Sequence, residues 1–294
     1  AYSRLEKNKM KIGIIGSNGF IGSNLKNYFK NQKKYKVFYF SSYNKFKKKW
    51  TEKICKEIKR NKPNLIINCA ASQVLNDDKK SIQSLLNSNL YSNIMFLNQA
   101  TNNKNFKGYI SFGTKWEFDS ERNYKPLNFY AATKNANDVF FKYFSLKKNI
   151  TIVSLKIFDT YGLNDKRKKV LNLLLSKYKN NQSLKITPGK QYLDFVNIHD
   201  ICILINIICR DILNNKLKGF KYYTVSSKKP IKLKSLINKM NLILDKKLQV
   251  KIGAKKYRSN EAMKPIRKLY NYPGWKPKLN LVKEIKKIFD DTND

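Results

Sequence analysis

Short apolar segments alternate with amphipathic segments along the first half of the chain. The apolar segments are rich in β-branched and aromatic residues, as buried parallel strands are, and they cover residues 11–15, 35–40, 65–68, 108–112 and 150–158. Segments with helical spacing of apolar residues lie between them, at 23–30, 52–60 and 81–100. This alternation predicts an α/β fold with a doubly wound parallel sheet.

Three glycines follow the first predicted strand, in the sequence Gly-Ser-Asn-Gly-Phe-Ile-Gly at 16–22. Gly16 allows a tight turn, Gly19 lets a pyrophosphate approach the backbone, and Gly22 lets the next helix pack closely on the sheet. The amides of that helix's first turn would face the anion. The motif predicts a Rossmann dinucleotide site, with expected cofactor contacts from Gly16, Asn18, Gly19, Phe20, Ile21 and Gly22.

The later part of the chain predicts a smaller lobe. An apolar helix is expected at 201–213, a strand at 222–226, and helices at 233–244 and 282–289. We expect residues 10–165 to form the dinucleotide-binding Rossmann domain. Residues 166–294 are expected to form mainly a C-terminal α/β lobe that binds the substrate, with 193–213 returning to the first domain. Residues 1–9 are interpreted as an N-terminal arm or an expression remnant.

The end of the second predicted strand bears on the choice of cofactor. A carboxylate at this point would bind the ribose hydroxyl of NAD and repel the phosphate of NADP. Here Ser41 and Ser42 follow the strand, and lysines stand at 45, 47 and 48. Hydroxyl and ammonium groups suit a 2′-phosphate, so NADP(H) is favoured, with NAD(H) as the alternative.

A set of catalytic residues is predicted further along. Thr114 follows the strand at 108–112, and sixteen residues later comes Tyr130-Ala-Ala-Thr-Lys134. The four-residue interval places Tyr130 and Lys134 on one face of a helix. The three residues resemble the Ser/Thr, Tyr and Lys set of the short-chain dehydrogenases. This resemblance implies that Tyr130 acts as a proton donor, that Lys134 lowers the pKa of that phenol and holds the nicotinamide ribose, and that Thr114 hydrogen-bonds a carbonyl oxygen.

These motifs together resemble the extended short-chain dehydrogenases/reductases of the NAD-dependent epimerase/dehydratase family, whose members act mostly on nucleotide sugars. The resemblance covers nearly the whole chain from residue 10. Asn68-Cys69-Ala70-Ala71 resembles the family's segment beside the cofactor, which implies cofactor contacts from Ala70 and Ala71. Asn89 matches the residue with which the family braces its active-site strand, and a solvated asparagine is the alternative.

The resemblance also implies substrate contacts, from Thr114, Lys115, Trp116, Asp159 and Arg258. Many relatives carry asparagine at the position of Asp159 and arginine at that of Leu193, so one usual diphosphate contact is missing here. Arg258 matches a late arginine that clamps the substrate diphosphate, and a surface arginine is the alternative. The helices that carry Asn89 and Tyr130 resemble those that pair in relatives, which implies a homodimer.

The same catalytic residues serve several reactions in the family. Dehydratases place Asp-Glu directly after the threonine, where this chain has Lys115-Trp116, so dehydration is not expected. The sequence most resembles the nucleotide-sugar 4-ketoreductase branch. This implies NADPH-dependent reduction of a nucleotide-activated 4-keto-6-deoxy sugar in surface-polysaccharide precursor synthesis. The alternatives are a 4-epimerase that retains NAD and a non-catalytic NADP-binding regulator.

The charge of the chain raises a further class of partner. Lysine and arginine number 61 against 20 acidic residues, a net charge of +41, which would suit nucleic acid. Only seven of the basic residues are arginine, and the lysines are spread over nearly every segment. Asparagine, isoleucine, phenylalanine and tyrosine are abundant too, and all share A/T-rich codons with lysine. We attribute the charge to genome composition and expect no dedicated nucleic-acid binding, although the field favours an anionic substrate.

Two further expectations concern location and metals. No apolar stretch is long enough to span a bilayer and the first twenty residues lack a signal-peptide core, so we expect no membrane insertion and a cytoplasmic protein. The cysteines lack metal-ligand spacing and are expected to be reduced core residues, with no metal site; they are Cys55, Cys69, Cys202 and Cys209.

Overall fold

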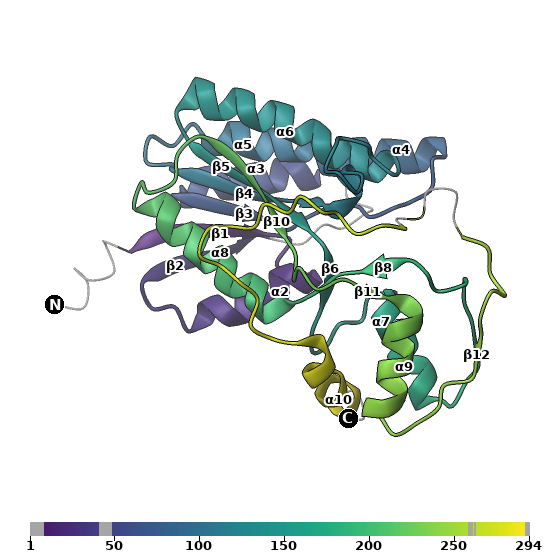
Figure 1. Cartoon of the computed structure of the whole chain (residues 1–294). Helices are drawn as coiled ribbons and strands as arrows, with labels where there is room; N and C mark the ends of the chain where they lie inside the picture. Colours follow the sequence, from purple (N-terminus) through teal and green to yellow (C-terminus); the bar gives the residue numbers. More distant parts are fainter. Residues whose placement is uncertain (1–8, 41–48, 258–260, 262, 292–294) are drawn as a thin grey trace. The chain divides into compact units, whose positions relative to one another are not determined.

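The computed structural model describes residues 9–40, 49–257, 261 and 263–291. Six strands form one sheet in the order β10-β5-β4-β3-β1-β2 (Figure 1). Their bounds are β1 Met10–Ile15, β2 Tyr35–Phe40, β3 Leu65–Asn68, β4 Gly108–Thr114, β5 Thr151–Ile157 and β10 Phe220–Val225. β1 pairs in parallel with β2 and β3, and β3 with β4. The strand order changes direction at β1, where folds of this type bind ligands at the carboxyl ends of the strands.

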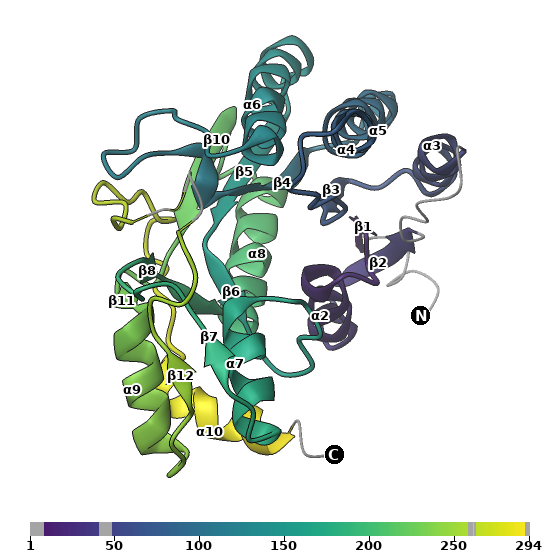
Figure 2. The same ribbon diagram turned by 90° about the vertical axis from the view of Figure 1, so that its right-hand side faces the viewer.

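Helices cover both faces of the sheet (Figure 2). α2 (Phe20–Lys30) and α8 (Ile198–Leu213) lie on one face, and α3 (Trp50–Asn61), α5 (Ser92–Ala100) and α6 (Phe129–Lys148) on the other. Ile54, Phe96, Tyr109 and Phe141 are almost completely buried between the sheet and the second set of helices. The prediction of a doubly wound α/β fold is therefore confirmed.

The local boundaries differ from the predicted ones in three informative places. α2 begins at Phe20 rather than at 23, because Gly19 is its extended N-cap, with φ −77° and ψ 169°. The helix predicted at 81–100 is divided into α4 (Lys79–Leu85), the π-helix η1 (Leu86–Tyr91) and α5. β4 continues two residues beyond the predicted end, so Thr114 is its last residue.

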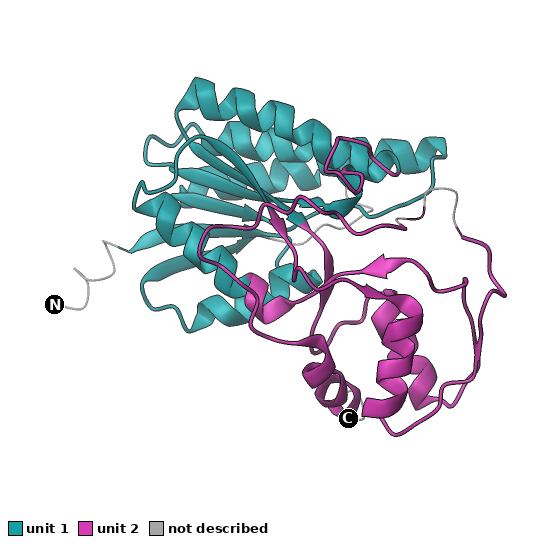
Figure 3. Ribbon diagram, in the orientation of Figure 1, with its two compact units in different colours: residues 1–117, 128–156, 202–223 teal, residues 118–127, 157–201, 224–294 magenta. Residues whose placement is uncertain are grey.

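The described residues form two compact units (Figure 3). The first contains those within 1–117, 128–156 and 202–223, and the second those within 118–127, 157–201 and 224–294. We keep the predicted division of binding roles at residue 165 as a proposal.

The described residues of the second unit include the helices α7, α9 and α10 and three strand pairs. α7 (Val170–Lys179), α9 (Leu233–Ile243) and α10 (Leu281–Asp291) share a core that includes Leu174, Leu236 and Ile285, all completely buried. The parallel pairs are β6 (Asp159–Tyr161) with β9 (Phe195–Asn197) and β7 (Leu184–Lys185) with β12 (Val250–Lys251). β8 (Tyr192–Leu193) and β11 (Ile231–Lys232) pair antiparallel.

In the described part of the chain, none of the helices combines the length and apolar character needed to cross a bilayer. The same residues contain no group of three or more His, Cys, Asp or Glu side chains that could hold a metal ion. All four cysteines are free thiols; Cys202 and Cys209 are buried, and Cys55 and Cys69 are half-buried.

Candidate active site

The glycine turn lies directly after β1. Gly16 has φ +76°, and a Cβ on it would lie 2.7 Å from the Ala70 amide nitrogen, so a side chain does not fit. A Cβ on Gly22 would overlap the Gly16 carbonyl oxygen, which means that this glycine lets α2 pack on the turn rather than on the sheet. A Cβ on Gly19 would meet the Gly16 carbonyl oxygen at an ordinary 3.5 Å. Packing within the protein therefore does not require a glycine at position 19, and the predicted approach of a ligand to its backbone stays a prediction.

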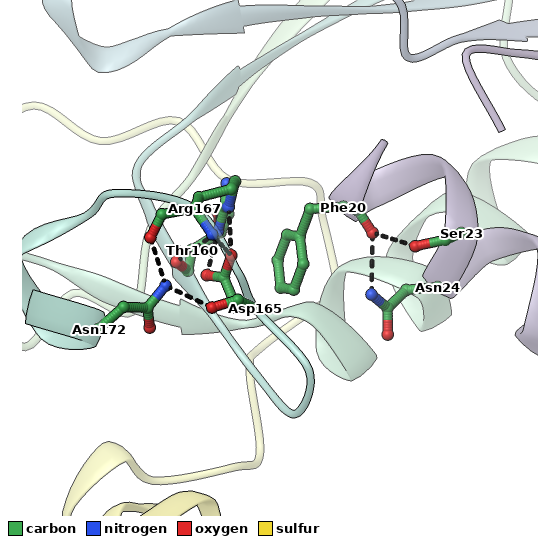
Figure 4. A network of polar contacts seen from close by, with 7 residues as sticks. All are labelled: Phe20, Ser23, Asn24, Thr160, Asp165, Arg167 and Asn172. Carbon is green, nitrogen blue, oxygen red and sulfur yellow. Dashed lines mark hydrogen bonds and ion pairs between the residues drawn. The ribbon is translucent and has the colours of Figure 1, made fainter. Parts of the chain in front are cut away.

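The amino end of α2 suits an anion. The Gly19 amide donates to the Gly16 carbonyl oxygen at 3.1 Å, which closes the turn. The Phe20 carbonyl oxygen accepts hydrogen bonds from Ser23 Oγ at 3.2 Å and Asn24 Nδ2 at 2.8 Å (Figure 4). The first turn of α2 carries no acidic residue, so nothing there opposes the positive end of the helix dipole. Asn18 is exposed on this turn, and Phe20 and Ile21 are half-buried. The turn therefore fits the pyrophosphate of a dinucleotide.

Three predicted site residues cannot be placed. Ser41, Ser42 and Arg258 lie outside the described residues. The contacts expected of the two serines with a 2′-phosphate, and of Arg258 with the substrate, stay predictions.

Asn89 holds the segment that follows β3. Its side chain is completely buried, its Oδ1 accepts from the Ser72 amide at 2.8 Å, and its Nδ2 donates to the Ser72 carbonyl oxygen at 3.0 Å. Nδ2 also lies 3.4 Å from Thr133 Oγ1 on α6. The alternative of a solvated asparagine is wrong. Asn89 braces the segment containing Ala70 and Ala71, not the strand that carries Thr114.

The structure brings the three predicted catalytic residues together in the first unit. The Trp116 amide donates to Thr114 Oγ1 at 3.3 Å, and the Trp116 ring meets the Tyr130 ring edge-on, with centroids 6.4 Å apart and an interplanar angle of 83°. Lys134 Nζ lies 5.9 Å from the centroid of the Tyr130 ring. Asn128 caps α6 by accepting from the Ala131 amide at 2.9 Å, which places Tyr130 in the first turn.

The electrostatics correct one prediction. Lys134 was expected to lower the pKa of Tyr130, but burial and, secondarily, the Glu117 carboxylate raise the pKa of this phenol, while a hydrogen bond from Gln73 opposes them. Burial lowers the pKa of Lys134 to about 8, with Glu117 opposing the change. At neutral pH the phenol therefore keeps its proton and most Lys134 side chains are cationic.

Two residues of this region were missed by the sequence reasoning. Gln73 lowers the pKa of Tyr130 through its side chain, and the Glu117 carboxylate accepts from the Thr114 amide at 2.7 Å. Gln73 carries no signal in the sequence. Glu117 does carry one, because it is an acidic residue three positions after the proposed catalytic threonine.

In the second unit, Asp159 and Asp194 connect neighbouring strands and loops. Asp159 Oδ2 accepts from the Asp194 amide at 3.0 Å. The Asp194 carboxylate accepts from the Ser226 hydroxyl at 2.5 Å and from the Ser227 amide at 2.8 Å. Both carboxylates thus have contacts within the unit, and a substrate contact of Asp159 stays a prediction.

Arg167 has a structural role that the sequence did not indicate. Its guanidinium pairs with both oxygens of Asp165 at 2.7 Å and donates to the Thr160 carbonyl oxygen at 3.0 Å (Figure 4). Asn172 Nδ2 closes the network by donating to the carbonyl oxygens of Asp165 and Arg167, at 2.8 and 2.9 Å. These contacts fix the turn after β6.

Comparison with known proteins agrees with the fold and the motifs. A CDP-abequose synthase from Yersinia pseudotuberculosis is 30% identical over 229 residues, which cover 76% of this chain and 78% of that protein.

Many solved structures share the fold. MoeE5 in complex with UDP-glucuronic acid and NAD superposes with a TM-score of 0.80 at 12% identity, covering 96% of this chain and 99% of its own. RMD from Pseudomonas aeruginosa complexed with NADPH superposes with a TM-score of 0.78 at 17% identity, covering 96% and 97%.

A family match covers most of the chain. Residues 12–217 match the NAD dependent epimerase/dehydratase family, and this range contains the glycine turn, Thr114, Tyr130 and Lys134. The family resemblance is thereby confirmed: the chain belongs to the NAD dependent epimerase/dehydratase family and is an NAD(P)-dependent enzyme.

Proposed function

We propose that the protein reduces the keto group of a nucleotide-activated 4-keto-6-deoxy sugar with NADPH, in the synthesis of surface-polysaccharide precursors. The observation that carries the proposal is the buried Tyr130 phenol, which holds its proton and packs against Trp116, the residue whose amide donates to the Thr114 hydroxyl. The similarity to CDP-abequose synthase supports a nucleotide sugar as substrate.

The side chains have complementary tasks in such a reduction. Bound NADPH would supply a hydride to the keto carbon. Tyr130 would give its proton to the keto oxygen as negative charge develops, a contribution of about 10²–10⁴-fold to the rate. The Lys134 cation would stabilise the phenolate that remains, and it would also hold the nicotinamide ribose.

Thr114 is prepared to act as a hydrogen-bond donor. Its Oγ1 already accepts from the Trp116 amide. A hydroxyl has one hydrogen to donate, so that of Thr114 can be directed to the keto oxygen. This supports stabilisation of the developing charge by an alcohol and a phenol together.

The neighbouring residues favour simple reduction over dehydration. Positions 115 and 116 hold lysine and tryptophan, so neither supplies a carboxylate. The next residue, Glu117, has a completely buried side chain paired with Lys156 at 2.5 Å, which does not suit acid or base chemistry on a substrate. The half-buried Trp116 ring offers an apolar surface that suits a deoxygenated sugar carbon.

The choice of NADPH rests on the sequence after β2. Ser41, Ser42 and the lysines at 45, 47 and 48 suit a 2′-phosphate, and no carboxylate stands at that point. Among the structures with a similar fold, RMD is complexed with NADPH and MoeE5 with NAD. The glycine turn at 16–22 would hold the pyrophosphate of either cofactor.

A panel assay tests the function. The purified protein is incubated with NADPH or NADH and with the CDP-, dTDP-, GDP- and UDP-activated 4-keto-6-deoxy sugars, and the loss of reduced-nicotinamide absorbance is recorded. We expect turnover of at least one sugar, faster with NADPH. Stoichiometric, tightly held NAD in the purified protein, with interconversion of 4-epimers and no net oxidation of added NADPH, would show a 4-epimerase instead.

We also propose that two copies pair through α6 and η1. Val139, Tyr143 and Leu146 lie on one face of α6 and are 69%, 58% and 76% exposed, and Tyr91 on the neighbouring η1 is 55% exposed. Sedimentation of the wild type is expected to give a dimer, and of the variant Val139→Lys/Leu146→Lys a monomer. A monomeric wild type at micromolar concentration would contradict the proposal.

A further inference from the structure

A cluster of buried charges lies next to the proposed catalytic threonine. Lys156 on β5 and Glu117 at the end of the short 3-10 helix η2 (Lys115–Glu117) have completely buried side chains. Lys156 Nζ lies 2.5 Å from Glu117 Oε2 and 2.7 Å from Asp138 Oδ2 on α6. Removing charges from water is costly, and a well-packed apolar pair often stabilises a fold equally well. Stability alone therefore does not account for the cluster.

Glu117 connects this cluster to Thr114. Its Oε1 accepts from the Thr114 amide at 2.7 Å, while its Oε2 faces Lys156 and lies 3.3 Å from Asn135 Nδ2. A hydrogen bond from an amide to a carboxylate is shorter and stronger than one between neutral groups. The backbone of Thr114, at the end of β4, is thus anchored to an ion pair that cannot move freely.

The strand makes room for this carboxylate. A Cβ on Gly113 would overlap Glu117 Oε1 and would lie 2.7 Å from Lys156 Cδ and 2.9 Å from Lys156 Nζ. Any larger residue at 113 would push both partners away from β4. Gly113 therefore leaves the space in which the Glu117 carboxylate and the Lys156 ammonium pack against β4 next to Thr114.

We infer that Glu117 is a positioning residue for the proposed reduction: clamped by Lys156, it fixes the Thr114 backbone so that the Thr114 hydroxyl meets the keto oxygen beside Tyr130. The inference rests on the proposed function. Glu117 acts through Thr114 and does not itself contact the substrate.

The variant Glu117→Gln tests the inference. Thr114 and Lys156 donate to different oxygens of Glu117, and a glutamine amide has one oxygen and one NH₂, so it cannot present an acceptor at both positions. If the glutamine oxygen stays with the Lys156 ammonium, the glutamine NH₂ faces the Thr114 amide, and two donors then oppose each other. We expect kcat to fall about 10- to 100-fold, as for a small misplacement of a reacting group. The KM values for NADPH and for the sugar are expected to stay within about threefold, because neither ligand is bound by Glu117.

Asp138→Asn is the matched control. This substitution removes the charge of the second carboxylate that pairs with Lys156. The Asp138 carboxylate has no contact with Thr114 in the described part of the chain. In protein labelled with ¹⁵N-threonine, with the Thr114 amide signal assigned from Thr114→Ser, we expect that signal to move in Glu117→Gln and to stay in place in Asp138→Asn. The fall in kcat is expected to be at least fivefold smaller in Asp138→Asn.

Three results would overturn the inference. The first is a folded Glu117→Gln protein with the wild-type kcat. The second is a Thr114 amide signal that does not move in Glu117→Gln. The third is an equal loss of kcat in Glu117→Gln and Asp138→Asn, which would show that Glu117 merely neutralises Lys156. If Glu117→Gln does not fold, Glu117→Leu/Lys156→Met removes both charges; a low kcat supports the inference and a wild-type kcat overturns it. A wild type that reduces no sugar defeats the proposed function, while the amide signal still decides whether Glu117 anchors Thr114.

Discussion

Replacing Lys134 by methionine is expected to stabilise the protein while impairing its activity. The lysine side chain is only 5% exposed, and burial lowers its pKa from 10.5 to about 8. The folded state therefore holds an ammonium that would be more stable in water. Methionine has a similar length, is unbranched and needs no hydration, so it should fill the same space without that penalty.

The size of the effect follows from the two pKa values. The difference between 10.5 in the unfolded chain and about 8 in the folded protein corresponds to about 3 kcal/mol. Below pH 8 both states of the wild type bind the proton, and the folded state bears the full penalty. Between pH 8 and 10.5 the unfolded state holds more protons, so the free energy of unfolding of the wild type rises with pH. The advantage of Lys134→Met should thus be about 3 kcal/mol at pH 7 and small above pH 10.5.

Urea unfolding of both proteins at pH 7 and at pH 10 measures this difference. Lys142→Gln is the control, since Lys142 lies exposed on the same helix, and it is expected to change the free energy of unfolding by less than about 0.5 kcal/mol at both pH values. The reductase rate of Lys134→Met should fall at least about tenfold, because the Tyr130 phenolate then lacks the cation near its ring. A methionine variant that is no more stable than the wild type at pH 7, or whose advantage is the same at pH 10, would refute the reasoning.

Three further substitutions test the glycine turn and Asn89. Gly19→Ala should leave the free energy of unfolding within about 0.5 kcal/mol of the wild type, because the added Cβ fits within the protein. It should weaken NADPH binding about tenfold or more by titration calorimetry, because the Cβ occupies the side of the turn where the ligand is expected. An unchanged NADPH affinity would count against the site. In Gly22→Ala the added Cβ overlaps the Gly16 carbonyl oxygen, so both the free energy of unfolding and the affinity for NADPH should fall. Asn89→Leu should lower the free energy of unfolding by about 1–3 kcal/mol, since the Ser72 backbone groups lose their partners, and an unaffected thermal midpoint would contradict this role.

Much of the first unit could be predicted from the sequence because its signals are local. The apolar runs predict the strands. The glycine spacing predicts the turn, because Gly16 adopts a positive φ there. The four-residue interval between Tyr130 and Lys134 is fixed by helix geometry. These features depend on residues close together in the chain, so a single sequence displays them.

The parts that the sequence did not reveal depend on contacts across long separations. Glu117 and Lys156 are 39 residues apart, and no local pattern shows that a lysine on β5 meets an acid after β4. The pKa of Tyr130 was predicted in the wrong direction because the Lys134 charge was considered without burial, the larger effect. The π-helix at Asn89 also has no signal in the apolar pattern.

The most direct test of the central claim is the rate at which Tyr130→Phe oxidises NADPH on the sugar that the wild type turns over fastest. Phenylalanine keeps the ring but removes the proton, so we expect the rate to fall about 10²–10⁴-fold while the affinity for NADPH changes less than about threefold. A Tyr130→Phe protein that reduces the same sugar at the wild-type rate would contradict the assignment of Tyr130 as the proton donor.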